Sequence, residues 1–213
     1  MASCTLRRAG GLRWTSPKHI RWLGRPVTSE TDRLEASWRL FSRSSTAKPS
    51  GSSMEALSQE ISEYFLKTRP TEDELEAKDM LFRKIESAGK ASLDGCRAEA
   101  FGSAGCGQWT AGSDLDICLL APGVTERHSQ VRGLKKVASI LRQSGASHNI
   151  EPRFGAQMPI LRWTPRRPGR LSSIACDISV ANVLAVANTQ LIAAYLKVDD
   201  RVPPLLRVIK VHG

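Results

Sequence analysis

Apolar residues recur at helical spacing in two consecutive segments that open the globular part of the chain. Four of them fall on one face of residues 55–67 and predict an amphipathic helix there: Leu57, Ile61, Tyr64 and Phe65. The next segment starts with Thr71-Glu-Asp-Glu, a capping box in which Thr71 caps a helix and Glu74 reaches back. We expect this second helix to end at Gly89, and both helices to serve packing alone.

Strand patterns and helical patterns alternate through the rest of the chain. Strands are expected at 97–101, 115–120, 150–154, 158–164 and 171–180. Helices are expected at 126–143 and 182–196, and a further apolar helix starts at Leu205 after a segment that ends in two prolines. Strands interleaved with helices indicate an α/β (α+β) fold.

Asp114 and Asp116 are separated by a single residue at the start of the strand expected at 115–120. Because alternate side chains of a strand share a face, both carboxylates point the same way while their apolar neighbours enter the core. Upstream, Gly102 lets the backbone approach a phosphate closely, and Ser103 offers a hydroxyl and an N–H to its oxygens. A phosphate-holding turn followed by paired carboxylates indicates phosphoryl or nucleotidyl transfer.

Asp177 interrupts the otherwise apolar strand expected at 171–180. A carboxylate in such a strand is costly unless a cation or a metal ion compensates it, and an ion pair with a neighbouring arginine is the alternative to a metal. Together with Asp114 and Asp116 it suits two-metal nucleotidyl transfer. In that scheme Asp177 serves the metal that activates an attacking 3′-hydroxyl, and the other two carboxylates bridge both metals.

The chain has 213 residues, 41% of them hydrophobic, which suits one globular domain with an extension. Its net charge of +10 favours a polyanionic partner. Much of this charge precedes Glu30, in a stretch that is also rich in hydroxyl side chains. Residues 1–48 are therefore typical of a transit peptide to the mitochondrion or another organelle. The alternative is a disordered basic arm that touches nucleic acid in a cytoplasmic or nuclear protein.

Membrane insertion, disulfides and zinc are not expected. No apolar segment is long enough to span a bilayer. The five cysteines include no Cys-x-x-Cys pair, and the histidines are scattered. Cys118 and Cys176 fall in strand patterns, where we expect them to be small buried hydrophobes.

With these motifs the chain resembles the polymerase-β-like nucleotidyltransferases, and within them the noncanonical poly(A) polymerases and terminal uridylyltransferases. The residues that carry the resemblance are Phe101-Gly102-Ser103, Gly107, Ser113-Asp114-Leu115-Asp116, Ala156 to Leu161, Cys176-Asp177-Ile178-Ser179, Asn182 and Asn188-Thr189. The likeness covers about residues 55–213. It implies a palm fold, a mixed sheet with flanking helices, preceded by two helices and a disordered leader.

The resemblance also implies a reaction and a set of site residues. The reaction is the addition of AMP or UMP, from ATP or UTP, to an RNA 3′ end with Mg²⁺ or Mn²⁺. Asp114, Asp116 and Asp177 would be the catalytic metal ligands. The nucleotide would be bound by Gly102, Ser103, Ser113, Asn182, Thr189 and Lys210.

The resemblance further implies a division of the chain into four parts. These are a leader (1–48), a linker with two helices (49–96), the catalytic palm (97–197) and the start of a helical central domain (198–213). In similar enzymes that central domain continues and selects between ATP and UTP, so we expect the chain to be a fragment or a truncated product with impaired activity. The two early helices would then keep exposed apolar faces.

Two other functions remain open from the sequence. One is a catalytically silent remnant that binds only RNA or a partner protein, which the basic loop with Arg166, Arg167 and Arg170 favours and the three intact carboxylates disfavour. The other is a nucleotidyltransferase with a small-molecule or protein acceptor, because one fold hosts sites for different acceptors.

Overall fold

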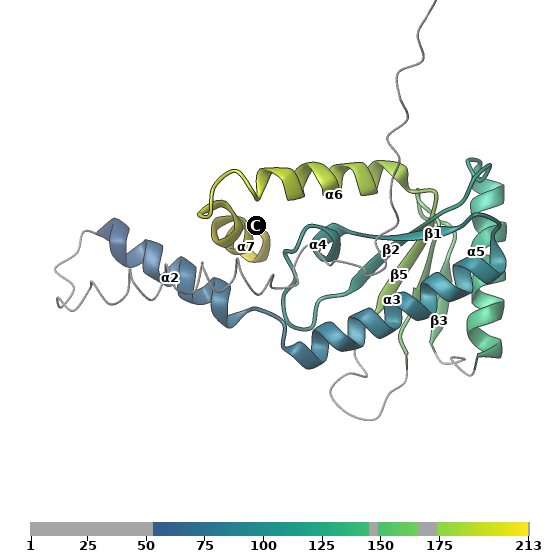
Figure 1. The fold of residues 1–213 in the computed structure, drawn as a ribbon, viewed down its shortest axis with the longest axis horizontal. Helices are drawn as coiled ribbons and strands as arrows, with labels where there is room; N and C mark the ends of the chain where they lie inside the picture. Colours follow the sequence, from purple (N-terminus) through teal and green to yellow (C-terminus); the bar gives the residue numbers. More distant parts are fainter. Residues whose placement is uncertain (1–52, 145–148, 166–173, 213) are drawn as a thin grey trace, which may run out of the picture.

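The structure is a computed structural model that describes residues 53–144, 149–165 and 174–212. Within these residues a five-stranded sheet lies between helices on both faces (Figure 1). The predicted leader at 1–48, the first residues of the strand expected at 171–180 and the basic loop at 166–170 fall outside the described residues. None of the described helices combines the length and the apolarity needed to cross a bilayer.

The sheet is mixed, as expected, with the strand order β1-β2-β5-β4-β3. Its strands are β1 (Arg97–Phe101), β2 (Leu115–Leu120), β3 (Ile150–Arg153), β4 (Ile160–Trp163) and β5 (Cys176–Val180). β2 and β5 run parallel at its centre, and the other neighbouring pairs are antiparallel. β4 is shorter than the expected strand at 158–164, because Pro159 offers no N–H to a partner strand.

Two long helices, α3 (Glu72–Ser92) and α5 (Arg127–Gln143), cover one face of the sheet. The opposite face carries the short α4 (Gly102–Gly105) and α6 (Val183–Tyr195), which runs along the upper side in Figure 1. The core between the sheet and the α3–α5 layer is made of fully buried aliphatic side chains, among them Leu115, Ile117, Leu119, Leu134 and Val137. The α3–α5 layer thus supports the face of β2 that carries Leu115, Ile117 and Leu119.

The capping box at the start of α3 is confirmed. The Glu74 amide donates to the Thr71 hydroxyl, and the Thr71 amide donates to the Glu74 carboxylate over 2.9 Å. The predicted end at Gly89 is wrong, because α3 continues to Ser92. Gly89 serves close packing instead: a Cβ added there would lie 2.9 Å from Leu119 Cδ2 on β2. The helix therefore needs this glycine where it presses on the sheet, not as a stop.

Helices α2 (Ser53–Lys67) and α7 (Val202–His212) pack against each other beside the sheet. α7 begins three residues before the expected start at Leu205, with Pro203 and Pro204 in its first turn, where the missing N–H groups cost no hydrogen bond. Arg207 is only 3% exposed and its guanidinium lies 4.5 Å from the centre of the Phe65 ring of α2. Part of the predicted apolar face of α2 is thus covered by α7, while Leu57 and Leu66 stay exposed.

Candidate active site

The carboxylates predicted at 114, 116 and 177 come together at one end of the two central strands. In the parallel register of β2 and β5, Asp116 lies directly opposite Asp177. Neighbouring strands are about 4.8 Å apart, so the two residues are immediate neighbours. Asp114 lies one residue before β2 and keeps the spacing that places it on the same face as Asp116. The sheet register thus joins two motifs that are far apart in the sequence.

Arg162 on β4 connects two of these carboxylates. It lies opposite Asp177 in the antiparallel β4–β5 register. One guanidinium nitrogen donates to Asp177 Oδ2 over 3.1 Å, and the other donates to Asp114 Oδ2 over 2.9 Å. Sequence reasoning anticipated an arginine partner for Asp177 only as an alternative and did not identify Arg162. The only sequence signal for Arg162 was a basic residue between apolar neighbours in a strand pattern, which is a weak one.

Burial and neighbouring charges raise the pKa values of Asp116 and Asp177. Burial, followed by the charges of Asp177 and Asp114, raises the pKa of the Asp116 carboxyl to about 6. The pKa of Asp177 is also above its ordinary value because burial outweighs the opposing charge of Arg162. Lys210 on α7 lowers the pKa of Asp116, so its positive charge acts on the site although its side chain is exposed. The positive charges of Arg162 and Lys210 thus only partly oppose the increase in the pKa of Asp116.

The turn that the sequence predicts to hold phosphate lies against Asp116. Gly102 has a φ of +62°, and a Cβ added there would be 2.5 Å from Asp116 Oδ2. Both facts require glycine. Where the sequence predicts a turn at Gly102-Ser103, the structure starts the short helix α4, and Ser103 is half-buried within it. The structure therefore places Gly102 next to Asp116, and Ser103 follows it in the first turn of α4.

Thr189 on α6 is hydrogen-bonded to this turn, and Asn182 precedes α6 as its N-cap. The Gly102 amide donates to Thr189 Oγ1 over 2.9 Å, and the Thr189 hydroxyl donates to the Ala185 carbonyl over 2.8 Å. Thr189 is only 5% exposed. Asn182 caps α6, and its side-chain oxygen accepts from the Ala185 amide over 3.4 Å. Thr189 thus fixes the turn at Gly102, and Asn182 fixes the start of α6.

The oxygen donors of the three aspartates, at the N-terminal ends of β2 and β5, are chemically suited to a divalent metal. Carboxylate oxygens are the ligands that Mg²⁺ and Mn²⁺ prefer. Such an ion would also offset the charges of Asp177 and Asp114, which after burial are the main causes of the raised pKa of Asp116. As the side chains stand, the carboxylates of the described residues do not converge as a group of three around one point. Arg162 lies between Asp114 and Asp177 instead, in contact with both. Metal binding and this ion pair compete for the same oxygens.

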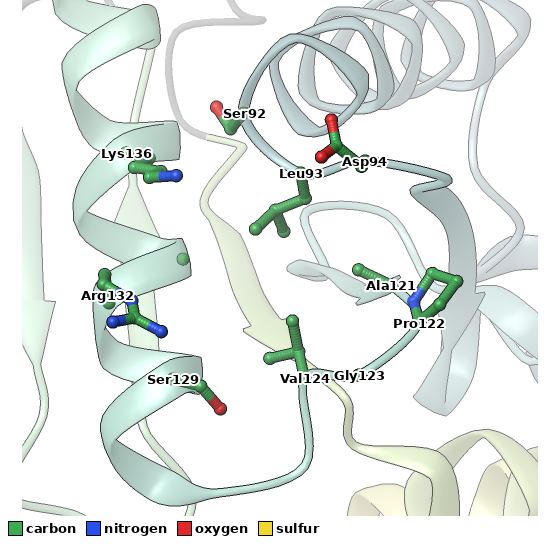
Figure 2. Close-up of a pocket in the computed structure, with 11 residues that line it drawn as sticks. Ser92, Leu93, Asp94, Ala121, Pro122, Gly123, Val124, Ser129, Arg132 and Lys136 are labelled. Carbon is green, nitrogen blue, oxygen red and sulfur yellow. The ribbon is translucent and has the colours of Figure 1, made fainter.

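A separate hollow of about 270 Å³ lies away from the carboxylates. It is formed by the end of α3, the turn after β2 and one side of α5, from which Arg132 and Lys136 approach it (Figure 2). It lies at the far end of β2 from Asp116, beyond Leu120. None of the predicted site residues lines it.

A family model described as the central palm domain of mitochondrial-like poly(A) RNA polymerases matches residues 57–197. The chain belongs to this family. The matched stretch includes α3 and the whole sheet, so the palm domain comprises every element that positions the carboxylates.

Known relatives of the palm domain are RNA-tailing enzymes. Human Terminal uridylyltransferase 7 is 33% identical over 144 residues, which are 67% of this chain and 9% of that protein. Poly(A) RNA polymerase GLD2 of Danio rerio is 30% identical over 164 residues, 72% of this chain and 31% of that protein. The chain therefore spans less than a third of either relative. GLD-2 in the GLD-2/RNP-8 complex matches with a TM-score of 0.67 and 27% identity over 75% of this chain and 55% of that chain.

Proposed function

We propose that this chain is the catalytic palm of a template-independent RNA nucleotidyltransferase that adds AMP or UMP to RNA 3′ ends. The observation that carries the proposal is the register that sets Asp116 opposite Asp177, with Asp114 on the same face and the Gly102 turn against Asp116. The membership of the palm family supports it, as do relatives that extend RNA with uridylate or adenylate. Because the relatives include both kinds, ATP and UTP remain equal candidates.

In this proposal Asp114, Asp116 and Asp177 would hold Mg²⁺ or Mn²⁺, which supplies activation of the 3′-hydroxyl and neutralises charge on the leaving group. The contribution of the chain is to position the reactants and to concentrate charge. Asp114 and Asp177 must leave Arg162 to bind a metal, and Asp116 must be ionised. The guanidinium that is released remains beside the site as a cation for substrate phosphates.

The nucleotide phosphates would lie on the Gly102 turn. Gly102 has no side chain to keep a phosphate away from Asp116, and the Ser103 and Ser113 hydroxyls would donate to phosphate oxygens. Lys210 would reach the triphosphate from α7, where its charge already acts on Asp116. Thr189 and Asn182 would shape the nucleotide site from α6.

The organisation and location of the chain belong to the same proposal. We propose a leader at 1–48, a linker and two helices at 49–96, the catalytic palm at 97–197, and the start of a helical domain at 198–213. The packing of α7 on α2 supports a continuous unit from the early helices to the last described one. The basic, hydroxyl-rich first residues and the mitochondrial-like family support an organellar location.

Incubation of the chain with Mn²⁺, labelled ATP or UTP and an oligoribonucleotide tests the reaction. We expect extension of the RNA 3′ end, abolished by Asp177→Ala and by Asp116→Asn. Asp94→Asn is the matched control, because Asp94 is exposed and lies at the other end of the sheet. Extension that survives Asp177→Ala would overturn the assignment. RNA binding without extension by the unaltered chain would favour a binding-only palm, and labelling of protein or small molecules without RNA would favour another acceptor.

A further inference from the structure

The first turn of α3 holds the loop that leads into the carboxylate strand. Glu74 closes the capping box with one carboxylate oxygen, and its other oxygen accepts from the Gly112 amide over 3.1 Å. Just before this helix, the Thr68 carbonyl accepts from the Ala111 amide over 3.2 Å. The backbone is thus fixed at two consecutive residues shortly before Asp114. Sequence reasoning gave these early helices a packing role alone.

Lys78 lies one turn further along α3 and continues this set of contacts. Its ammonium donates to Ser113 Oγ over 3.0 Å and lies 4.3 Å from the centre of the Trp109 ring. Only 1% of the residue is exposed. Lysine is almost never this buried unless a partner compensates it. Among the described residues, Ser113 is the hydrogen-bond partner of its ammonium, and Ser113 directly precedes Asp114.

Burying this charge is unfavourable, so the position is not explained by packing. Burial lowers the pKa of the Lys78 ammonium to about 8, while the charges of Glu74, Asp114 and Asp116 act in the opposite direction. The side chain therefore stays protonated at pH 7, and it lies close enough to the carboxylates for their charges to act on it. A methionine would fill the same space beside Trp109 without the cost of removing an ammonium from water.

The chemistry of the contact fixes the direction of the Ser113 hydroxyl. An ammonium has three donors and no acceptor, so Ser113 Oγ must accept from Lys78. Its own hydrogen then points elsewhere and remains available to donate. Ser113 is half-buried and directly precedes Asp114, so this contact holds the residue from which the chain enters the carboxylate strand. A hydrogen bond from a charged donor also makes the hydroxyl a stronger donor in turn.

We propose that Lys78 is a positioning residue of the nucleotide site, which holds Ser113 in place and thereby fixes the approach of the chain to Asp114. This inference rests on the proposed function and adds a residue of α3 to it. Lys78 does not touch the substrate and acts through Ser113. Its role is distinct from the packing of α3 on the sheet, which the apolar face of the helix provides.

Calorimetric titration of the 213-residue chain with the α,β-imido analogues of ATP and UTP, in Mn²⁺, tests the inference. The variants are Lys78→Met, Ser113→Ala and the double variant, and thermal unfolding is measured on each. We expect Lys78→Met to weaken nucleotide binding about tenfold. Its unfolding temperature should be equal or higher, because methionine removes the buried charge. In the Ser113→Ala background, Lys78→Met should change affinity by less than about twofold, because the two residues act as one unit.

Lys84→Met is the matched control, an exposed lysine on the same helix that should leave nucleotide affinity unchanged. Three results would overturn the inference: an affinity loss equal to that of Lys84→Met, a loss that adds to that of Ser113→Ala, or a loss that follows a lower unfolding temperature. In each of these cases the unaltered chain still binds nucleotide and the proposed function stands. If the unaltered chain binds neither analogue, the proposed function fails, and the role of Lys78 fails with it.

Discussion

Arg162 and Asp177 face each other across β4 and β5, and the guanidinium of Arg162 lies 3.1 Å from Asp177 Oδ2. The same guanidinium reaches Asp114 over 2.9 Å, so it joins two of the proposed metal ligands. In the absence of a metal, Arg162 is therefore the cation that keeps the carboxylates together. We therefore expect the stability of the chain to depend on whether a divalent ion is present.

Replacing Arg162 by methionine should expose this dependence. Without metal we expect the variant to lose about 1–2 kcal/mol of unfolding free energy, because its partners are partly exposed and the carboxylates lose their shared cation. Added Mn²⁺ should raise the unfolding temperature of Arg162→Met more than that of the unaltered chain, since no guanidinium competes for the oxygens. Arg97→Met, at an exposed ion pair on β1, is the control and should respond like the unaltered chain. An equal response of both variants would contradict the competition.

Asp116 should give the metal-free chain a characteristic pH dependence. Its folded-state pKa is about 6, above the ordinary value of an aspartate, so the native state binds this proton more tightly than the unfolded state does. The stabilising contribution is complete below the unfolded pKa and is lost as the pH rises toward 6. We expect Asp116→Asn to remove this part of the slope and to be more stable than the unaltered chain above pH 6 without metal. Urea unfolding at several pH values measures this.

The control for the Asp116 prediction is Asp94→Asn, which should leave the slope unchanged because Asp94 is exposed and distant from the cluster. With saturating Mn²⁺ the unaltered chain should become more stable than Asp116→Asn, since the metal stabilises only a chain with an ionised Asp116. An Asp116→Asn variant that is less stable than the unaltered chain at pH 7.5 without metal would show that its charge is compensated in the folded state.

Two glycines with positive φ allow the effect of contact at Gly102 to be separated from backbone strain. Gly102→Ala adds a Cβ that meets Asp116 Oδ2, whereas Gly123→Ala, at a φ of +75° in the turn after β2, meets nothing within 4 Å. Each substitution should cost about 1–2 kcal/mol of unfolding free energy for the left-handed conformation. Only Gly102→Ala should also weaken the binding of Mn²⁺ and nucleotide, because it displaces a proposed metal ligand. Equal binding by both variants would argue against close contact of the turn with Asp116.

Thr189 links α6 to the turn at Gly102. Two replacements separate the contribution of its hydroxyl group from that of its methyl group. Thr189→Val keeps the volume but leaves the Gly102 amide without its acceptor, which should cost about 1–3 kcal/mol of unfolding free energy. Thr189→Ser keeps the acceptor and should lose less. Unfolding in urea and titration with the nucleotide analogues measure both effects. A Thr189→Val variant as stable as the unaltered chain would show that the hydrogen bond to the Gly102 amide does not contribute to stability.

Local rules in the sequence predicted the elements well wherever neighbours along the chain decide the structure. The capping box at Thr71 and Glu74 is present because both partners lie within one helical turn. The strand after Asp114 was readable from its alternating pattern. The same rules failed at Gly89, where a glycine that resembles a helix stop is required by contact with Leu119 on a distant strand. They also placed the start of α7 too late, because its prolines occupy positions that need no N–H.

The sequence by itself determined where the chemically distinctive residues lie along the chain: Gly102 and Ser103, and the carboxylates at 114, 116 and 177. Residue type and spacing along one strand suffice for that, since side-chain direction alternates along a strand. Only the tertiary structure decided how these groups meet. The strand register set Asp116 opposite Asp177, and long-range packing brought Arg162 and Lys78 to the site. Charges from separate segments affect one another only after folding has buried them together, so no pattern along the chain encodes those contacts.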